Sequence, residues 1–149
     1  MLIESRESTD VAVRQLTAEQ QAELAALLGG GQVQYRLRPG TEFMVGVIDG
    51  RPVGCGALQP IAPSVGEVKR MYVRPAYRGQ GLSRLILAAV EERAVELGYH
   101  TLRLETGRLM ARAIGLYQGA GFRTIPLFGE YVGNAESVCF EKSLLPALT

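Results

Sequence analysis

The sequence predicts a mixed α/β fold in which one central sheet of about six to seven strands carries helices on both faces. Strand-like runs alternate along the chain with segments whose apolar residues recur at three- and four-residue spacing. No repeat, low-complexity tract or Pro- or Ser-rich linker divides the 149 residues. We therefore expect a single domain over residues 1–149 with one hydrophobic core.

The first 42 residues are expected to hold a short strand, a helix and a segment whose secondary structure the sequence leaves undecided. Residues 2–5, LIES, have strand composition. Residues 10–28 place apolar side chains at mostly helical spacing, and the glycines that follow Leu28 end this helix. Residues 32–42 show no clear period, so a second short helix and a loop both remain open.

The middle of the chain predicts a β-hairpin followed by another strand. Residues 43–48 and 52–58 flank Asp49-Gly50, a dipeptide that supplies the positive backbone angles of tight hairpin turns. We expect Pro60 and Pro63 to end the second strand. Residues 65–74 form the next candidate strand, which Pro75 stops because proline has no N–H for a sheet ladder.

The second half predicts a long amphipathic helix and four shorter elements. Gly98 lies where a left-handed cap of the long helix would fall. The apolar series of that helix comprises Leu82, Leu85, Ile86, Ala89, Val90, Ala94 and Leu97. The remaining elements are a strand at 100–106, a helix at 110–120 and strands at 122–128 and 137–144.

Composition argues against several classes of function. The net charge is +1, with 16 basic and 15 acidic residues mixed along the chain, so neither nucleic acid nor an anionic membrane is an expected partner. No apolar run approaches the roughly 20 residues of a membrane span, and the N-terminus is acidic where a signal peptide is basic. We expect a soluble, cytoplasmic protein.

Cysteine and histidine chemistry is not expected to carry the function. Cys55 and Cys139 lie far apart in strand-like segments, which predicts two reduced, packed thiols. His100, the only histidine, has no Ser, Cys or carboxylate in motif spacing, so it is interpreted as structural. With one histidine and no ligand cluster, no metal site is expected.

The stretch Arg-Gly-Gln-Gly-Leu-Ser at residues 78–83 lies where the strand at 65–74 ends and the long helix begins. The N–H groups of a helix's first turn have no intrahelical acceptor, and the helix dipole is positive there. Gly79 and Gly81 would let a phosphate approach the backbone, although glycines also relieve tight turns. Five basic residues between positions 67 and 84 favour the anion site; they are Lys69, Arg70, Arg74, Arg78 and Arg84.

Residues 78–83 resemble the [QR]xxGx[GA] acetyl-CoA motif of the GNAT superfamily of N-acetyltransferases. The stretch VKRMYVRPAYRGQG resembles that family's fourth strand and pyrophosphate loop. LRLETG, AIGLYQGAGF and SVCFEKSL resemble its fifth strand, following helix and closing strand, so the likeness covers residues 43 to 145. Ser83 departs from the usual Gly or Ala, and either adds a bond to the pyrophosphate or pushes the loop back. Met110-Ala111-Arg112 replaces a stretch that often holds Asn or Gln.

The resemblance implies acetyl transfer from acetyl-CoA to a primary amine of a small molecule, with a peptide as the less favoured acceptor, in a ternary complex without an acyl-enzyme. It implies splayed fourth and fifth strands and an oxyanion donor at the Met71 N–H, within a bulge. Met71, Tyr72 and Val73 would pair with the pantetheine arm. The diphosphate would be bound by Arg78, Gly79, Gln80, Gly81, Leu82, Ser83 and Arg84.

The resemblance assigns two side chains to proton transfer, and each assignment has an alternative. Glu67 matches a general base, or it pairs with Lys69 or Arg70. Tyr117 matches the residue that donates a proton to the CoA thiolate and also contacts the cofactor. The alternative is that its ring packs in the core. Residues 29–42 and 126–136 would select the acceptor, and the resemblance also allows a homodimer. A silent acyl-CoA-binding module and an unrelated phosphate-binding α/β domain remain the alternative functions.

Overall fold

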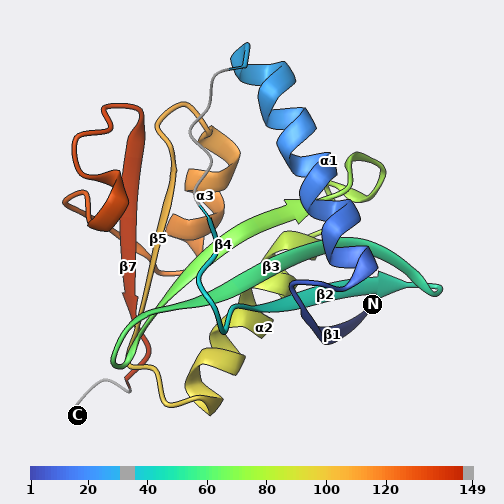
Figure 1. Ribbon diagram of the computed structural model, residues 1–149, viewed down its shortest axis with the longest axis horizontal. Helices are drawn as coiled ribbons and strands as arrows, with labels where there is room; N and C mark the ends of the chain where they lie inside the picture. Colours follow the sequence, from blue (N-terminus) through green and yellow to red (C-terminus); the bar gives the residue numbers. More distant parts are fainter. Residues whose placement is uncertain (31–35, 146–149) are drawn as a thin grey trace.

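The computed structural model describes residues 1–30 and 36–145. Within them, seven strands form one sheet in the order β1-β2-β3-β4-β5-β7-β6 (Figure 1). Strands β4 and β5 run parallel, and every other neighbouring pair is antiparallel. The predicted mixed α/β class and strand number are therefore confirmed.

The N-terminal elements follow the predicted order. They are β1 (Leu2–Glu7), α1 (Val11–Leu28), β2 (Glu42–Ile48), β3 (Arg51–Ala62) and β4 (Val65–Val73). The Asp10 carboxylate accepts from the backbone N–H of Ala12 at 2.9 Å and so caps α1. Gly29, in the left-handed conformation, ends the helix as predicted. Asp49 and Gly50 have φ values of 49° and 74°, which confirms the tight hairpin turn.

The C-terminal elements also agree in order with the prediction. They are η1 (Pro75–Tyr77), α2 (Leu82–Glu96), β5 (Thr101–Gly107), α3 (Ala111–Gly119), β6 (Arg123–Ile125), η2 (Gly129–Tyr131) and β7 (Ser137–Ser143). Strand β7 lies between β5 and β6, so the closing strand enters the sheet next to β5. Gly98 has a φ of 84°, the expected left-handed residue after α2.

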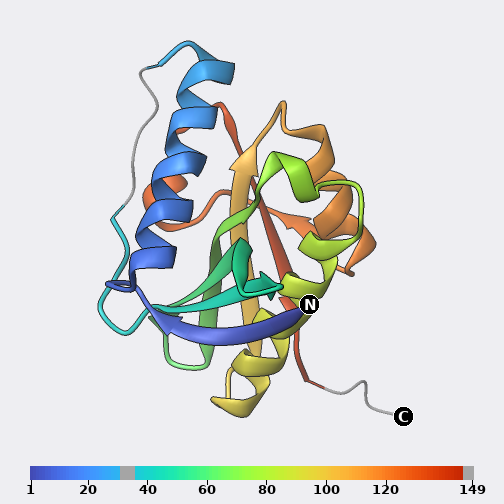
Figure 2. The ribbon, with the colours of Figure 1, turned by 90° about the vertical axis from the view of Figure 1, so that its right-hand side faces the viewer.

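The sheet separates two layers of helix (Figure 2). On one face, α2 and α3 pack on an apolar core that includes Leu58, Val68, Leu87 and Phe140. On the other face, Val13 and Leu16 of α1 pack against Phe43, Cys55, Tyr72 and neighbouring residues. The short η2 helix covers this second face near β4. Predicted helices on both faces are thus confirmed.

Some predicted details of the elements were wrong. Strand β3 continues through Pro60 to Ala62, because Pro60 sits at a register shift where its missing N–H costs no ladder bond. In α2, Leu85 belongs to the predicted apolar series but is 53% exposed. Leu87 is outside that series but is 1% exposed and therefore part of the buried face. Residues 36–41 form no helix, and residues 32–35 of the undecided segment lie outside the described residues.

Candidate active site

Strand β4 is bulged at Arg70 and Met71. Cys55 of β3 lies opposite Tyr72, and Ala57 lies opposite Lys69, so two β4 residues face Gly56 alone. Arg70 is the extra residue of the bulge and adopts a left-handed backbone conformation, with a φ of 57°. A Cβ at Gly56 would meet the Met71 sulfur at 2.5 Å and Ile86 at 3.1 Å, so a larger residue here would have to displace the Met71 side chain. The bulge therefore lies where the sequence comparison with the GNAT pattern predicts it.

The two parallel strands diverge directly before the bulge. Residues Val65–Val68 of β4 pair with Thr101–Leu104 of β5, and the pairing stops there. Strand β4 continues to Val73 and β5 to Gly107 without pairing to each other, so their ends splay apart (Figure 1). There, the β4 edge that faces β5 has no strand partner among the described residues; this unpaired edge is called the gap. The predicted splay of the fourth and fifth strands is confirmed.

The peptide groups of Met71 and Val73 face this gap. The Arg74 N–H donates to the Val53 carbonyl at 2.8 Å, and Tyr72 pairs with Cys55, so alternate residues of this segment face β3. Met71 and Val73 therefore face the opposite side. Their carbonyl oxygens accept from side chains, Met71 from Gln20 Nε2 at 2.9 Å and Val73 from Arg78 Nε at 2.8 Å.

The predicted diphosphate loop leads into the first turn of α2. Gly79 and Gly81 have φ values of 79° and 78°, so the loop conformation itself favours glycine. A Cβ built on either residue meets no atom within 4 Å, which shows open space outside the loop. Among residues 1–30 and 36–145, no side chain caps α2, and a hydrogen bond from the Leu85 N–H to the Gly81 carbonyl closes its first turn at 3.3 Å. The first-turn amides therefore lack a side-chain cap from the described residues, which is the arrangement that binds anions at helix N-termini.

Two of the clustered arginines are paired with α1. Arg74 makes a two-pronged contact with the Glu19 carboxylate at 3.0 and 2.7 Å. Arg78 reaches Glu23 at 2.8 and 2.7 Å, and its guanidinium lies 5.6 Å from the centre of the Tyr72 ring. The positive charge that the sequence gathers at the loop is partly balanced by α1.

The other predicted loop residues divide into buried and exposed ones. Leu82 packs in the core with Ile86, so only its backbone can face a ligand. Ser83 lies half-buried in the first turn of α2, the early helical position expected of it. Gln80 and Arg84 are exposed.

A buried polar cluster lies on the α1 face beside the gap. Glu67 is 4% exposed and accepts from the Tyr131 hydroxyl at 2.5 Å and from Gln59 Nε2 at 3.1 Å. Lys69 Nζ donates to the Tyr131 oxygen at 2.8 Å and lies 3.9 Å from the Glu67 carboxylate. Glu67 therefore forms the ion pair with Lys69 that the alternative assignment describes. It also belongs to a hydrogen-bond network that extends to Tyr131 in η2.

Sequence reasoning missed Tyr131 and Gln59. Tyr131 belongs to the stretch 126–136, which has no hydrophobic period that would orient a side chain. Gln59 lies directly opposite Glu67 in the register of β3 and β4, a pairing that only the strand alignment reveals. Burial and the Glu67 charge raise the pKa of the Tyr131 phenol, so this hydroxyl remains a proton donor at neutral pH.

A second carboxylate, Glu105, lies on β5 at the start of the gap. Its carboxylate accepts from the Ser137 hydroxyl, and burial raises its pKa above the usual range. The Ser137 bond and the Lys69 charge oppose that rise. Glu105 and the Glu67 cluster are therefore close enough to influence one another electrostatically.

Tyr117 lies on α3 and is 6% exposed. Its ring contacts Phe122 and Phe140, with centroids 5.9 and 6.5 Å apart. Burial, followed by the nearby Glu105 charge, raises the pKa of its phenol. The ring therefore packs in the core, as the alternative assignment has it, and its hydroxyl is held protonated.

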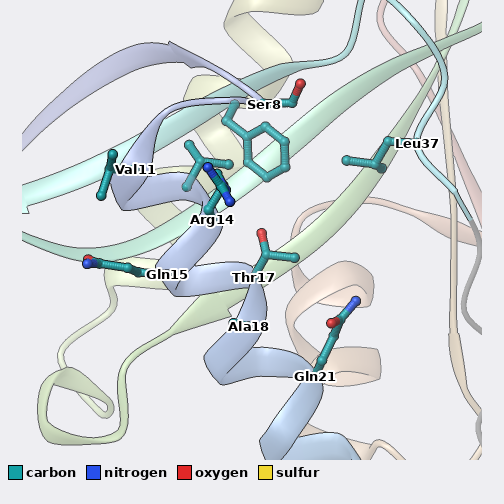
Figure 3. A pocket seen from close by; sticks show the side chains of 10 residues that line it. Ser8, Val11, Arg14, Gln15, Thr17, Ala18, Gln21 and Leu37 are labelled. Carbon is teal, nitrogen blue, oxygen red and sulfur yellow. The ribbon is translucent and has the colours of Figure 1, made fainter.

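A groove of about 590 Å³ lies along α1 (Figure 3). Thr17 and Gln21 of the helix, together with Leu37 and Phe43, are among its lining residues. It contains none of the residues that the sequence assigns to catalysis or cofactor binding. It is therefore separate from the catalytic and cofactor-binding residues and, of the described residues, shares only Leu37 with the stretch 29–42 that would select the acceptor.

The remaining sequence expectations concern metals, thiols and membranes. Over residues 1–30 and 36–145, no group of three or more potential metal ligands is present. Cys55 and Cys139 are buried free thiols, and His100 is exposed at the start of β5. No helix in the described part of the chain has the length and apolar character to cross a bilayer.

Comparison with known proteins gives consistent results. A profile of the Acetyltransferase (GNAT) family matches residues 8–122. An "IAA acetyltransferase" of Azospirillum brasilense is 38% identical over 113 residues, which cover 75% of this chain and 74% of the relative. A Klebsiella pneumoniae structure described as an acyl-CoA N-acyltransferase superposes with a TM-score of 0.85 at 35% identity, covering 97% of both chains.

A more distant structure shares the fold and was crystallised with acetyl-CoA. This GNAT acetyltransferase of Elizabethkingia anophelis has acetyl-CoA bound, with a TM-score of 0.72 and 17% identity over 95% of this chain and 97% of its own. The bulged β4, the gap beside it and the uncapped α2 accompany a family match over more than half of the chain. The chain therefore belongs to the GNAT family of acetyltransferases.

Proposed function

We propose that this protein transfers an acetyl group from acetyl-CoA to a primary amine of a small molecule, in one direct step. The observation that carries the proposal is the continuity between two features. The gap at the β4 bulge opens next to the uncapped first turn of α2, joined to it by residues 74–81. A long ligand with a diphosphate and a reactive thioester fits that arrangement, and relatives bound to acetyl-CoA support it.

The cofactor half of the site is built from backbone. The N–H groups of residues 79–84 would hold the diphosphate, with the positive end of the α2 dipole behind them. Met71 and Val73, which face the gap, would pair with the pantetheine arm as an added strand. The Met71 N–H would then stabilise the negative charge that develops on the thioester oxygen.

The acceptor half is built from side chains on the α1 face. An amine that is protonated at neutral pH must lose a proton before it attacks, and Glu67 would receive that proton through water. Tyr131, Gln59 and Lys69 hold the Glu67 carboxylate in place. The pair of electrons freed on nitrogen forms the new C–N bond.

The leaving group needs a proton as the C–S bond breaks. Tyr117, which the resemblance assigns to this role, would supply it from a phenol that is protonated at neutral pH, and it would regain a proton from solvent after the product leaves. The ammonium group loses two protons, one to Glu67 before the attack and one to water as the tetrahedral intermediate collapses. One of them balances the proton that the CoA thiol gains, and the other is the net proton released with the amide and the thiol. No side chain forms a covalent intermediate in this scheme.

Three further features belong to the proposal. The acceptor is a small molecule, which the name of the Azospirillum brasilense relative supports. The compartment is the cytoplasm, where the two free buried thiols would stay reduced. Residues 1–149 act as one catalytic domain.

The test combines thiol release from acetyl-CoA with calorimetry of CoA binding. The amine panel would contain spermidine, lysine, glutamate and a simple alkylamine. We expect thiol release that depends on at least one amine. Tight CoA binding with no turnover on the panel would instead indicate a silent binding module. Equal affinity for adenosine 3′,5′-bisphosphate and CoA would indicate a phosphate site that does not use the pantetheine arm.

A further inference from the structure

Gln20 connects helix α1 to the bulged strand. Its Nε2 donates to the Met71 carbonyl at 2.9 Å, between residues 51 positions apart in the sequence. The other end of the same amide, Oε1, is buried and has no hydrogen-bond partner among the described residues. A buried acceptor without a donor costs free energy, so a group that occupies the site would gain by supplying one.

The location of this amide relates it to the reaction. Met71 is the residue whose N–H we assign to the oxyanion, and its carbonyl faces the same gap. Because Nε2 and Oε1 share one carbon, a molecule bonded to Oε1 lies beside Met71. Gln20 approaches from α1, which covers the sheet face that also carries Glu67 and Tyr131. That is the acceptor side of the site.

We propose that Gln20 is a positioning residue for the transfer reaction, an assignment that rests on the proposed function. Its Nε2 fixes the Met71 backbone at the bulge, and its Oε1 accepts an N–H from the attacking amine. The amine is thereby held next to the thioester carbonyl, while Glu67 takes its proton. Gln20 itself neither gains nor loses a proton.

The helix already has other attachments to this region, which makes a structural role distinguishable. Glu19 and Glu23 bind Arg74 and Arg78 and anchor the same part of α1. Removing the Gln20 amide should therefore leave α1 in place. Loss of catalysis with little loss of stability is the expected pattern for positioning.

The matched pair of variants is Gln20→Met and Gln21→Met. Both remove one side-chain amide from α1 at nearly constant volume, and Gln21 lines the separate groove of Figure 3. Loss of the two Gln20 hydrogen bonds should lower kcat by about 10-fold, and raise the KM for the amine, since each such bond is worth about a factor of five. The KM for acetyl-CoA should stay within about twofold, as the diphosphate contacts are unchanged.

A third variant separates the two ends of the amide. Gln20→Glu keeps an acceptor oxygen and loses the donor to Met71 at neutral pH. We expect the KM for the amine to recover toward the wild-type value while kcat stays low. Equal kinetics for Gln20→Met and wild type, or equal losses in Gln20→Met and Gln21→Met, would overturn the assignment.

Hydrogen exchange gives a readout that does not need turnover. Amide exchange in residues 69–74 should be faster in Gln20→Met than in wild type and Gln21→Met, because the Met71 carbonyl is no longer held. Unchanged exchange would refute the contact with Met71 even in an inactive protein. Absence of amine-dependent thiol release by the wild type would refute the proposed function instead.

Discussion

In the proposed site, the two faces of the sheet contribute by different means. On the α2 side the core is apolar apart from the Tyr117 hydroxyl, and the cofactor would mainly meet backbone amides at the start of α2. On the α1 side a carboxylate, a lysine, a glutamine and a tyrosine are buried together beside β4. The first face suits a ligand shared by a whole family, and the second can vary with the acceptor.

The two faces should also differ in which substitutions they tolerate. A backbone site depends on loop conformation and space, so glycine positions control it. A buried side-chain network depends on each partner, because removing one leaves another buried polar group without its bond. Substitutions on the two faces should therefore affect different steps.

Glu67→Gln should have the largest effect, on the acceptor side. If Glu67 is the general base, kcat/KM should fall by roughly 10²- to 10⁴-fold, because an amide cannot accept the proton. CoA affinity, measured by calorimetry, should change little. Steady-state thiol release with a saturating amine provides the measurement.

The matched control is Glu141→Gln on β7. Glu141 pairs with Arg103 and Arg123 and has no contact with the Glu67 cluster among the bonds and ion pairs of the described residues. Its activity should remain near that of the wild type. Wild-type activity in Glu67→Gln, with only a lower Tm, would instead make Glu67 an ion-pair partner of Lys69.

Gly81→Asp should have the next largest effect, on the cofactor side. A carboxylate at the mouth of the loop would repel the diphosphate and weaken CoA binding by at least about 100-fold. Gly81→Asn is the control, since Asn has nearly the same size and also tolerates positive φ. Calorimetry should show a much smaller loss for Asn, and equal losses would show that backbone strain dominates over charge.

Tyr117→Phe should lower kcat by about 10- to 100-fold with little change in CoA affinity, since proton donation to the thiolate is lost. Tyr99→Phe is the control, because Tyr99 packs against the same core cluster. Intact turnover in Tyr117→Phe would assign Tyr117 to the core alone. A burst experiment would show whether the C–S cleavage step is the one that slows.

Glu105→Gln should have the smallest effect, on stability. Burial raises the folded-state pKa of Glu105 above 4.5, so the folded protein keeps this proton longer than the unfolded chain. Stability should fall as the pH rises from about 4.5 through that raised pKa. The amide removes this loss, and Tm at pH 7 should rise by about 2 °C.

The pH dependence gives the check for Glu105. Wild type and Glu105→Gln should unfold at similar temperatures near pH 4 and diverge as the pH rises. A constant difference across that range would mean that the charge of Glu105 does not contribute. Differential scanning at several pH values in one buffer series measures it.

The cofactor side could be predicted from the sequence because its features are local. Gly79 and Gly81, the end of a strand and the apolar series of α2 lie within 30 residues, and helix periodicity places them. The hairpin at Asp49-Gly50 was predictable for the same reason. Pro60 was misjudged because a register shift in β3 admits it, a feature that depends on the neighbouring strand.

The acceptor side could not be predicted to the same degree. Tyr131 meets Glu67 across 64 residues and Gln20 meets Met71 across 51, and no sequence pattern encodes either contact. Arg74 and Arg78 read as a basic patch in the sequence, yet the fold pairs both with acids of α1. Contacts between distant segments decide these features.

A crystal structure with acetyl-CoA bound would test the central claim most directly. We predict the diphosphate within hydrogen-bond distance of the backbone N–H groups of residues 79–84, and the thioester oxygen at the Met71 N–H. A diphosphate bound elsewhere, with the α2 amides still facing solvent, would contradict the assignment of both halves of the site.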